Sequence, residues 1–172
     1  MQIVGIMKKN IAFVTLNTLI DIMLFRKTPA QLPYSYSVLF LILMLDLGLT
    51  AFNLSFFKDA TLKEEILVSG ASLAIYLGLL YSLLTFRGVQ PRFHKTALAI
   101  LGCEVLLFFP SRFNVLISIP ITIWQFCIEG HILKNSLDIK MAKGILIALG
   151  LQIISALPIL FVFYGRIPVQ PS

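Results

Sequence analysis

The chain has 172 residues, of which 58% are hydrophobic and 13% are charged, and its mean hydropathy is +0.92. Soluble domains carry about 45–50% apolar and about 25% charged residues, so this chain has too few polar side chains to cover a water-soluble globule. Its net charge of +6 comes from basic residues in short gaps between apolar runs, a distribution that orients membrane segments. The composition therefore predicts an integral, multi-pass membrane protein and excludes a nucleic-acid-binding domain.

Residues 1–33 predict an N-terminal amphipathic helix that lies in the membrane interface. The apolar stretch from Asn10 to Phe25 would be about 24 Å long as a helix, which is shorter than the ~30 Å hydrocarbon core. Polar residues recur along it at roughly helical spacing, and basic residues flank both ends. No small-residue cleavage site follows, which argues against a signal peptide. A short first span over residues 10–25 is the alternative.

Five apolar runs follow, and they predict an all-α, polytopic helix bundle that forms one domain over residues 34–166. The predicted transmembrane helices cover residues 34–57, 65–86, 93–110, 113–131 and 142–164. The third and fourth are short and are joined by the tight turn "FPSR", so we expect them to form a close helical hairpin. No internal repeat and no low-complexity linker divides the chain.

The distribution of basic residues predicts the orientation of this bundle. With five spans, ten Lys and Arg residues fall on one side and four on the other, whereas a sixth span would make the distribution eight against six. Because the side richer in Lys and Arg faces the cytoplasm, we expect a cytoplasmic N-terminus and an outside C-terminus, in the inner membrane if the source is bacterial. Arg87, Arg92 and Lys95 surround a cytoplasmic loop, where we expect contacts with anionic lipid head groups.

Two acidic residues, Asp46 and Glu104, lie inside predicted spans. A charge near the bilayer centre costs about 2.5–3.5 kcal/mol on insertion scales. Asp46 lies about 18 Å and Glu104 about 16 Å from the cytoplasmic start of its span, so both carboxyls are expected near the midplane. If they face each other, both cannot stay ionised, which predicts a proton or cation site with Asn53 or Gln152 as neighbours. The alternative is that each acid is protonated or hydrogen-bonded and only specifies helix packing.

Glu129 belongs to the end of the fourth predicted span. We expect its side chain to reach the interface there and to pair with His131 or Lys134.

Small residues predict a packing face on the second span. Gly70, Ala74 and Gly78 follow one another at intervals of four, a pattern that lets another helix approach closely. We expect a helix of the same chain on this face, or alternatively a second copy. Gly144 and Ala148 repeat the pattern at the start of the fifth span.

The motifs of common enzymes are missing from the sequence. It contains no HExxH, GxSxG, P-loop or GxGxxG pattern. Its two cysteines, Cys103 and Cys127, lie inside apolar runs without the spacing of a metal or redox site. An intramembrane aspartyl protease needs two neighbouring aspartates, and Asp46 is the only one inside a predicted span. The sequence therefore predicts a protein without catalytic residues, bound metal or cofactor.

Three segments carry a resemblance to a known family: "TPAQLPYSYSVLFL" before the first span, "QPRFHKTALAILG" at the third and "WQFCIEGHILKNSLDI" at the end of the fourth. Together with the order of spans, they resemble the small Yip-type (Ypt/Rab-interacting) multi-pass membrane proteins and their bacterial relatives, over about residues 34–164. The resemblance implies a non-enzymatic protein that acts through other membrane proteins or lipids. It supplies no site residues.

The predicted function is accordingly that of a scaffold, assembly or trafficking-type factor. Its partners would be membrane lipids and either other membrane proteins or a second copy of the chain. The alternative is a small proton-coupled transporter or channel subunit that uses Asp46 and Glu104. Transport needs a polar path from Asp46 to both surfaces, and the first span offers a thin and broken one, which favours the scaffold. The residues of that path are Ser35, Ser37, Thr50 and Asn53.

Overall fold

The computed structural model describes residues 2–54, 61–108, 110–112 and 115–164, and these residues form a helical bundle without any strand. This confirms the predicted all-α class. The helices are α1 (Gln2–Met23), α2 (Tyr36–Leu54), α3 (Leu62–Phe86), α4 (Phe93–Phe108), α5 (Val115–Leu137), α6 (Met141–Ser155) and α7 (Leu157–Tyr164). Three short 3-10 turns join them, η1 (Pro29–Gln31), η2 (Gln90–Arg92) and η3 (Pro110–Arg112).

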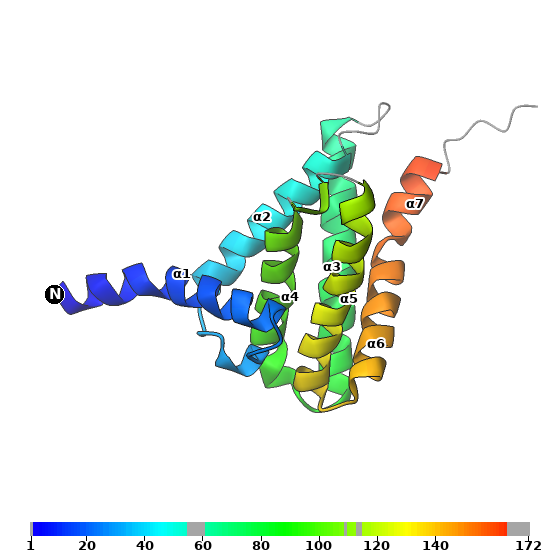
Figure 1. Cartoon of the computed structure of the whole chain (residues 1–172). Helices are drawn as coiled ribbons and strands as arrows, with labels where there is room; N and C mark the ends of the chain where they lie inside the picture. Colours follow the sequence, from blue (N-terminus) through cyan, green and yellow to red (C-terminus); the bar gives the residue numbers. More distant parts are fainter. Residues whose placement is uncertain (1, 55–60, 109, 113–114, 165–172) are drawn as a thin grey trace, which may run out of the picture.

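Four helices, α3 to α6, run alongside one another, and α2 leans across them (Figure 1). α2 packs on α3 and α4, and α7 continues beyond α6 with contacts to α3. The loops after α3 and after α5 lie at one end of the bundle, which also carries η1 (Figure 1). This end holds Arg87, Arg92 and Lys95, and we refer to it as the basic end.

Local sequence signals explain where several of these helices begin and end. α3 starts with a capping box, in which the Thr61 hydroxyl accepts from the Glu64 N–H at 3.4 Å and the Glu64 carboxylate accepts from the Thr61 N–H at 3.1 Å. After α3 the chain turns at Gly88, whose φ of +70° suits glycine. These local signals mark both ends of α3 in the sequence.

Three helical stretches are long and apolar enough to cross a membrane: Lys63–Phe86, Leu116–Leu137 and Met141–Val162. They match the second, fourth and fifth predicted spans. The other two predicted spans correspond to shorter helices: α4 has 16 residues, about 24 Å, and the apolar stretch of α2 within the described side chains is Tyr36–Phe52. The five-span prediction is therefore supported for three helices.

α1 runs across the bundle rather than along it (Figure 1). Leu19 and Ile22 are buried where α1 packs on α4 and α5. The side of α1 that faces away is apolar and exposed, and Phe13 is 62% exposed. The structure departs from the predicted amphipathic pattern, since Thr18, one of the polar residues along this stretch, is buried and donates to the Val14 carbonyl at 2.8 Å. An interfacial position for α1 stays a prediction.

The apolar core fills the part of the bundle next to the basic end. Most of its side chains come from the last turns of α3, the first turns of α4 and the last turns of α5, and the most deeply buried of these are at most 1% exposed. They include Leu80, Leu84, Leu98, Ile132 and Leu133. This layer is closely packed and apolar.

Glycines bring α5 and α6 into close contact. A Cβ atom on Gly144 would collide with the Gly130 carbonyl oxygen and lie 3.2 Å from its carbonyl carbon. A Cβ atom on Gly130 would lie 3.0 Å from the backbone nitrogen of Ile145. Ala148 is fully buried one turn further along α6. The pattern of Gly144 and Ala148 thus marks a close helix contact inside the chain, as the sequence predicts.

The last predicted span is divided into two helices. α6 ends at Ser155, and the N–H of Ala156 closes it by donating to the Gln152 carbonyl at 3.0 Å. Pro158 then has no N–H with which to continue the α6 hydrogen-bond pattern, so α7 begins as a separate helix at Leu157.

Candidate functional site: an acidic cavity in the helix bundle

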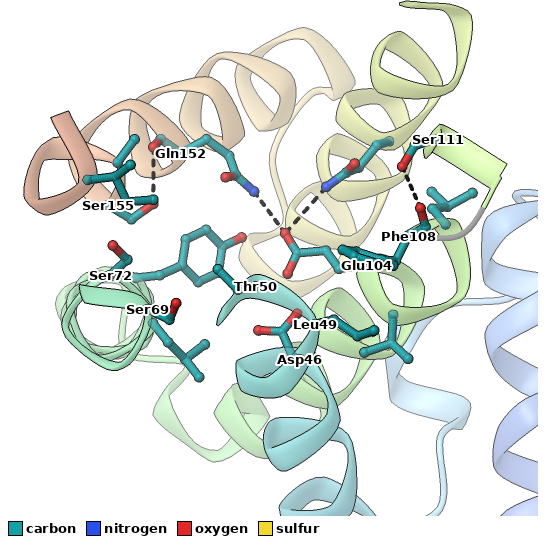
Figure 2. Close-up of a pocket in the computed structure, with 17 residues that line it drawn as sticks. Asp46, Leu49, Thr50, Ser69, Ser72, Glu104, Phe108, Ser111, Gln152 and Ser155 are labelled. Carbon is teal, nitrogen blue, oxygen red and sulfur yellow. Dashed lines mark hydrogen bonds between the residues drawn. The ribbon is translucent and has the colours of Figure 1, made fainter. Parts of the chain in front are cut away.

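A cavity of about 320 Å³ lies between α2, α3, α4, α5, α6 and α7 (Figure 2). It lies beyond the apolar core as seen from the basic end. Its polar lining consists of Asp46, Thr50, Ser69, Ser72, Tyr76, Glu104, Ser111, Gln125, Gln152 and Ser155. Its apolar lining consists of Leu49, Leu73, Val105, Leu107, Phe108, Ala156 and Ile159. Among the described residues, no Lys, Arg or His lines this space, so the two carboxyls make it acidic.

Two glutamines bridge two glutamates at the floor of the cavity. The side-chain amide of Gln152 donates to Oε1 of Glu104 at 2.9 Å and to Oε1 of Glu129 at 3.1 Å. The amide of Gln125 donates to the same two oxygens, at 3.4 Å and 3.3 Å. We call Gln125 and Gln152 the amide clamp. Since one NH₂ group has two hydrogens, each glutamine can serve both carboxylates at once.

Tyr76 completes the environment of Glu129. Its hydroxyl donates to Oε2 of Glu129 at 3.5 Å, and both residues are buried. Glu129 therefore has hydrogen-bond partners on both carboxylate oxygens, from α3, α5 and α6. Buried polar groups of this kind hold a fixed position because losing any partner leaves an unpaired oxygen.

Helical spacing explains how the clamp is assembled. Gln125 and Glu129 are four residues apart on α5 and so lie on one face. The adjoining side of α5 meets α6 at Gly130 and Gly144, which brings the two backbones close enough for Gln152 to reach Glu129.

Asp46 and Glu104 point into the same cavity from α2 and α4 (Figure 2). The two acids that the sequence singled out are thus brought to one site. Glu104 is tied to the amide clamp by Oε1, whereas no described group donates a hydrogen bond to its Oε2 or to the Asp46 carboxylate. Of the neighbours expected for this pair, Gln152 is in place, and the side chain of Asn53 lies outside the described residues.

The prediction for Glu129 is wrong. Its side chain is 1% exposed and bonds to Tyr76 and the amide clamp, not to His131 or Lys134. The reason is that α5 extends to Leu137, so Glu129 is more than two turns from the helix end.

The small-residue face of α3 points away from the cavity. A Cβ atom on Gly70 would lie 4.0 Å from Leu47 of α2, but a Cβ atom on Gly78 would have no described atom within 4 Å. Ala74 is exposed between them. A contact of this face with a second copy or another protein stays a prediction.

Two of the three basic residues assigned to lipid head groups have partners inside the protein. Arg92 forms an ion pair with Asp138 at 2.7 Å and donates to the Ser136 carbonyl at 3.0 Å. Lys95 donates to the Ala30 carbonyl at 2.6 Å, while Arg87 is exposed at the end of α3. These bonds tie η1 to α4 and the end of α5 to η2, and contact with lipid stays a prediction.

Sequence reasoning missed Gln125, Tyr76, Ser69 and Ser72 as parts of the site. The four-residue spacing of Gln125 and Glu129 inside an apolar helix was a usable signal, because two polar side chains on one face of a membrane helix indicate a polar partner.

Comparisons with protein-family models, with curated proteins and with solved structures give no match to this chain. The resemblance to Yip-type proteins therefore stays a prediction, and the functional argument depends on the geometry of the cavity.

Proposed function

We propose that this protein binds a small cation in its acidic cavity and is a small proton-coupled transporter or channel subunit. The observation that carries the proposal is that Asp46 and Glu104 line one cavity that no described basic residue lines. The sequence alone favoured a scaffold, and the cavity changes that preference.

The electrostatics of the cavity require a positive charge. A buried carboxylate without a counter-charge is costly, so it binds either a proton or a cation. The amide clamp provides neutral donors for Glu104 and Glu129 but adds no charge. Acidic residues inside membrane helices commonly mark ion or proton pathways for this reason.

The position of the cavity favours a gated mechanism over an open pore. Between it and the basic end lies the apolar core, in which Leu80, Leu98 and Ile132 are fully buried. A cation held by Asp46 and Glu104 would thus have access from one side only, and passage would need a second conformation in which this core opens. Protonation of the same carboxyls would release the cation and couple the two fluxes.

The membrane arrangement that accompanies this proposal has five spans, with α2 and α4 joining the three longer helices, and α1 in the interface. It places the N-terminus in the cytoplasm and the C-terminus outside. Single cysteines introduced at Gln90, Asp138 and Thr61, in a chain whose native cysteines are replaced by serine, test this by labelling in intact cells. Only the Thr61 position should react with an impermeant reagent added outside; labelling of the other two would overturn the orientation.

Proton movement into proteoliposomes tests the function. Vesicles with an internal pH dye and the wild-type protein should show acidification that depends on an imposed cation gradient. Asp46→Asn and Glu104→Gln should each lower the rate at least tenfold, because each removes one carboxylate from the cavity. Asp138→Asn, which removes a carboxylate at the basic end, is the matched control. Equal rates in all three variants, or no flux in the wild type, would overturn the proposal.

A scaffold or assembly role is the second candidate, and the exposed face of α3 favours it. Ala74 is exposed and no described atom lies near Gly78, so another helix could approach there closely. Cysteine crosslinking at Gly78 in native membranes, with Leu146 on an exposed side of α6 as the control position, tests this. A crosslinked product specific to Gly78 is expected, and equal crosslinking at both positions would contradict a specific contact.

A further inference from the structure

Two buried hydroxyls in the cavity lining have no partner among the described residues. Ser69 is 1% exposed and Ser72 is 9% exposed, and neither side chain forms a hydrogen bond within that part of the chain. Other hydroxyls on helices of this chain donate to the carbonyl four residues before them, each at 2.8 Å. These are Thr15, Thr18, Ser82, Thr96 and Thr122. Because a buried unpaired hydroxyl costs about 1–3 kcal/mol, the two serines indicate a ligand.

The free groups of the cavity define what this ligand must offer. The acceptors are the Asp46 carboxylate and Oε2 of Glu104, which receive no hydrogen bond from the described residues, and the two serine oxygens. Both hydrogens of each clamp amide are already used on Glu104 and Glu129. A matching ligand therefore carries several hydrogen-bond donors and a positive charge.

The size and the walls of the cavity distinguish an organic cation from a metal ion. A space of about 320 Å³ is far larger than a bare ion, and apolar side chains such as Leu49, Leu73 and Ile159 line part of it. No three His, Cys, Asp or Glu side chains converge as metal ligands within the described part of the chain. These features suit a charged head with a short apolar body.

We propose that the cavity binds a protonated primary amine with a short alkyl or similar apolar substituent. An ammonium group has three donors and no acceptor, so it can donate to three of the four free acceptor groups, which are the Asp46 carboxylate, Oε2 of Glu104 and the hydroxyls of Ser69 and Ser72. The substituent contacts Leu49, Leu73 and Ile159. This inference rests on the proposed function of the cavity as a cation site, and it adds the chemical class of the cation.

Thermal unfolding of the purified full-length protein in detergent tests the ligand class. The probes are butylammonium, tetramethylammonium, potassium and butanol at equal concentration and ionic strength. At about ten times its dissociation constant, butylammonium should raise the melting temperature by about 3–6 °C. Tetramethylammonium, which has no N–H donor, and the other two should have less than a third of that effect. Equal shifts from butylammonium and potassium or tetramethylammonium would overturn the proposal.

The serines allow a variant that separates binding from folding. In Ser69→Ala/Ser72→Ala, the melting temperature without ligand should stay unchanged or rise, since only unpaired hydroxyls are removed. The dissociation constant for butylammonium should increase about tenfold or more. Ser82→Ala is the matched control, because Ser82 is exposed on the same helix and bonds to the Gly78 carbonyl. If the double variant does not fold, the two single variants carry the same comparison. Unchanged butylammonium binding in the variants would overturn the proposal.

The two proposals fail in different ways. If butylammonium binds selectively but no flux of protons or amine occurs in proteoliposomes, transport is wrong and the ligand class stands. If a flux that depends on Asp46 occurs but no amine binds, the ligand class is wrong and transport stands.

Discussion

Replacing Gln152 by methionine removes the stronger half of the amide clamp while keeping a side chain of similar length. Two hydrogen bonds are lost, to Oε1 of Glu104 at 2.9 Å and to Oε1 of Glu129 at 3.1 Å. Gln125 still donates to both oxygens, but at 3.4 Å and 3.3 Å. The variant therefore leaves two carboxylates with one weak donor each on these oxygens.

The size of the effect follows from these distances. A hydrogen bond to a charged group contributes about 1.5–3 kcal/mol, and the remaining donors make the lower value the appropriate one for each bond. The free energy of unfolding should thus fall by about 3 kcal/mol. For a chain of this length, that lowers the melting temperature by about 6–12 °C.

The assay is thermal unfolding in detergent, followed by fluorescence of Trp124, the single tryptophan, which directly precedes Gln125. Gln31→Met is the control, because Gln31 is exposed in η1. Gln125→Met and the variant with both substitutions complete a double-mutant cycle. The loss of unfolding free energy in the double variant should differ from the sum of the two single losses by more than about 0.5 kcal/mol, since both amides donate to the same oxygens. A Gln152→Met loss below about 0.5 kcal/mol, equal to that of Gln31→Met, would refute the clamp.

Three further changes test the packing of the bundle by the same melting assay. Gly144→Ala should lower the free energy of unfolding by about 2 kcal/mol or more, because the new Cβ meets the Gly130 backbone. Gly78→Ala, with open space around it, should leave that free energy unchanged or raise it by up to about 1 kcal/mol. Equal effects of the two variants would contradict the close contact between α5 and α6. Leu19→Ala should cost about 2–4 kcal/mol and expose α1 to protease, while Phe13→Ala, at an exposed position, should leave both unchanged. Arg92→Met should lower the free energy of unfolding by about 1 kcal/mol, since the ion pair of Arg92 with Asp138 is largely exposed. A loss above about 3 kcal/mol would contradict the view that this exposed ion pair adds little to stability.

The shared level of Asp46 and Glu104 along the bundle was predictable because the rise of an α-helix per residue is fixed, whereas their depth in a membrane stays a prediction. Once the apolar runs indicated where α2 and α4 begin, counting residues was enough to place both carboxyls at one level. The same counting failed for Glu129, because the predicted end of its helix was six residues too early. Boundaries depend on capping and tertiary contacts, which apolar runs do not encode.

The rotation of α3 about its axis was not predictable from its small residues. At 3.6 residues per turn, two sets of side chains occupy opposite sides of this helix. One set is Gly70, Ala74 and Gly78; the other is Ser69, Ser72 and Tyr76. The pattern favoured burial of the first set, yet the second is buried. Polar side chains are costly against lipid, and this cost outweighs the close packing that small residues permit.

The break between α6 and α7 gives the walls of the cavity different stiffness. Gln152 belongs to α6, which is held against α5 at Gly144, whereas Ile159 belongs to α7, a helix of only eight residues. With no N–H at Pro158, fewer backbone bonds cross the junction at Ala156. The α7 wall is therefore held by contacts with α3 and α6, whereas the wall that carries the amide clamp is fixed by the close backbone contact between α5 and α6.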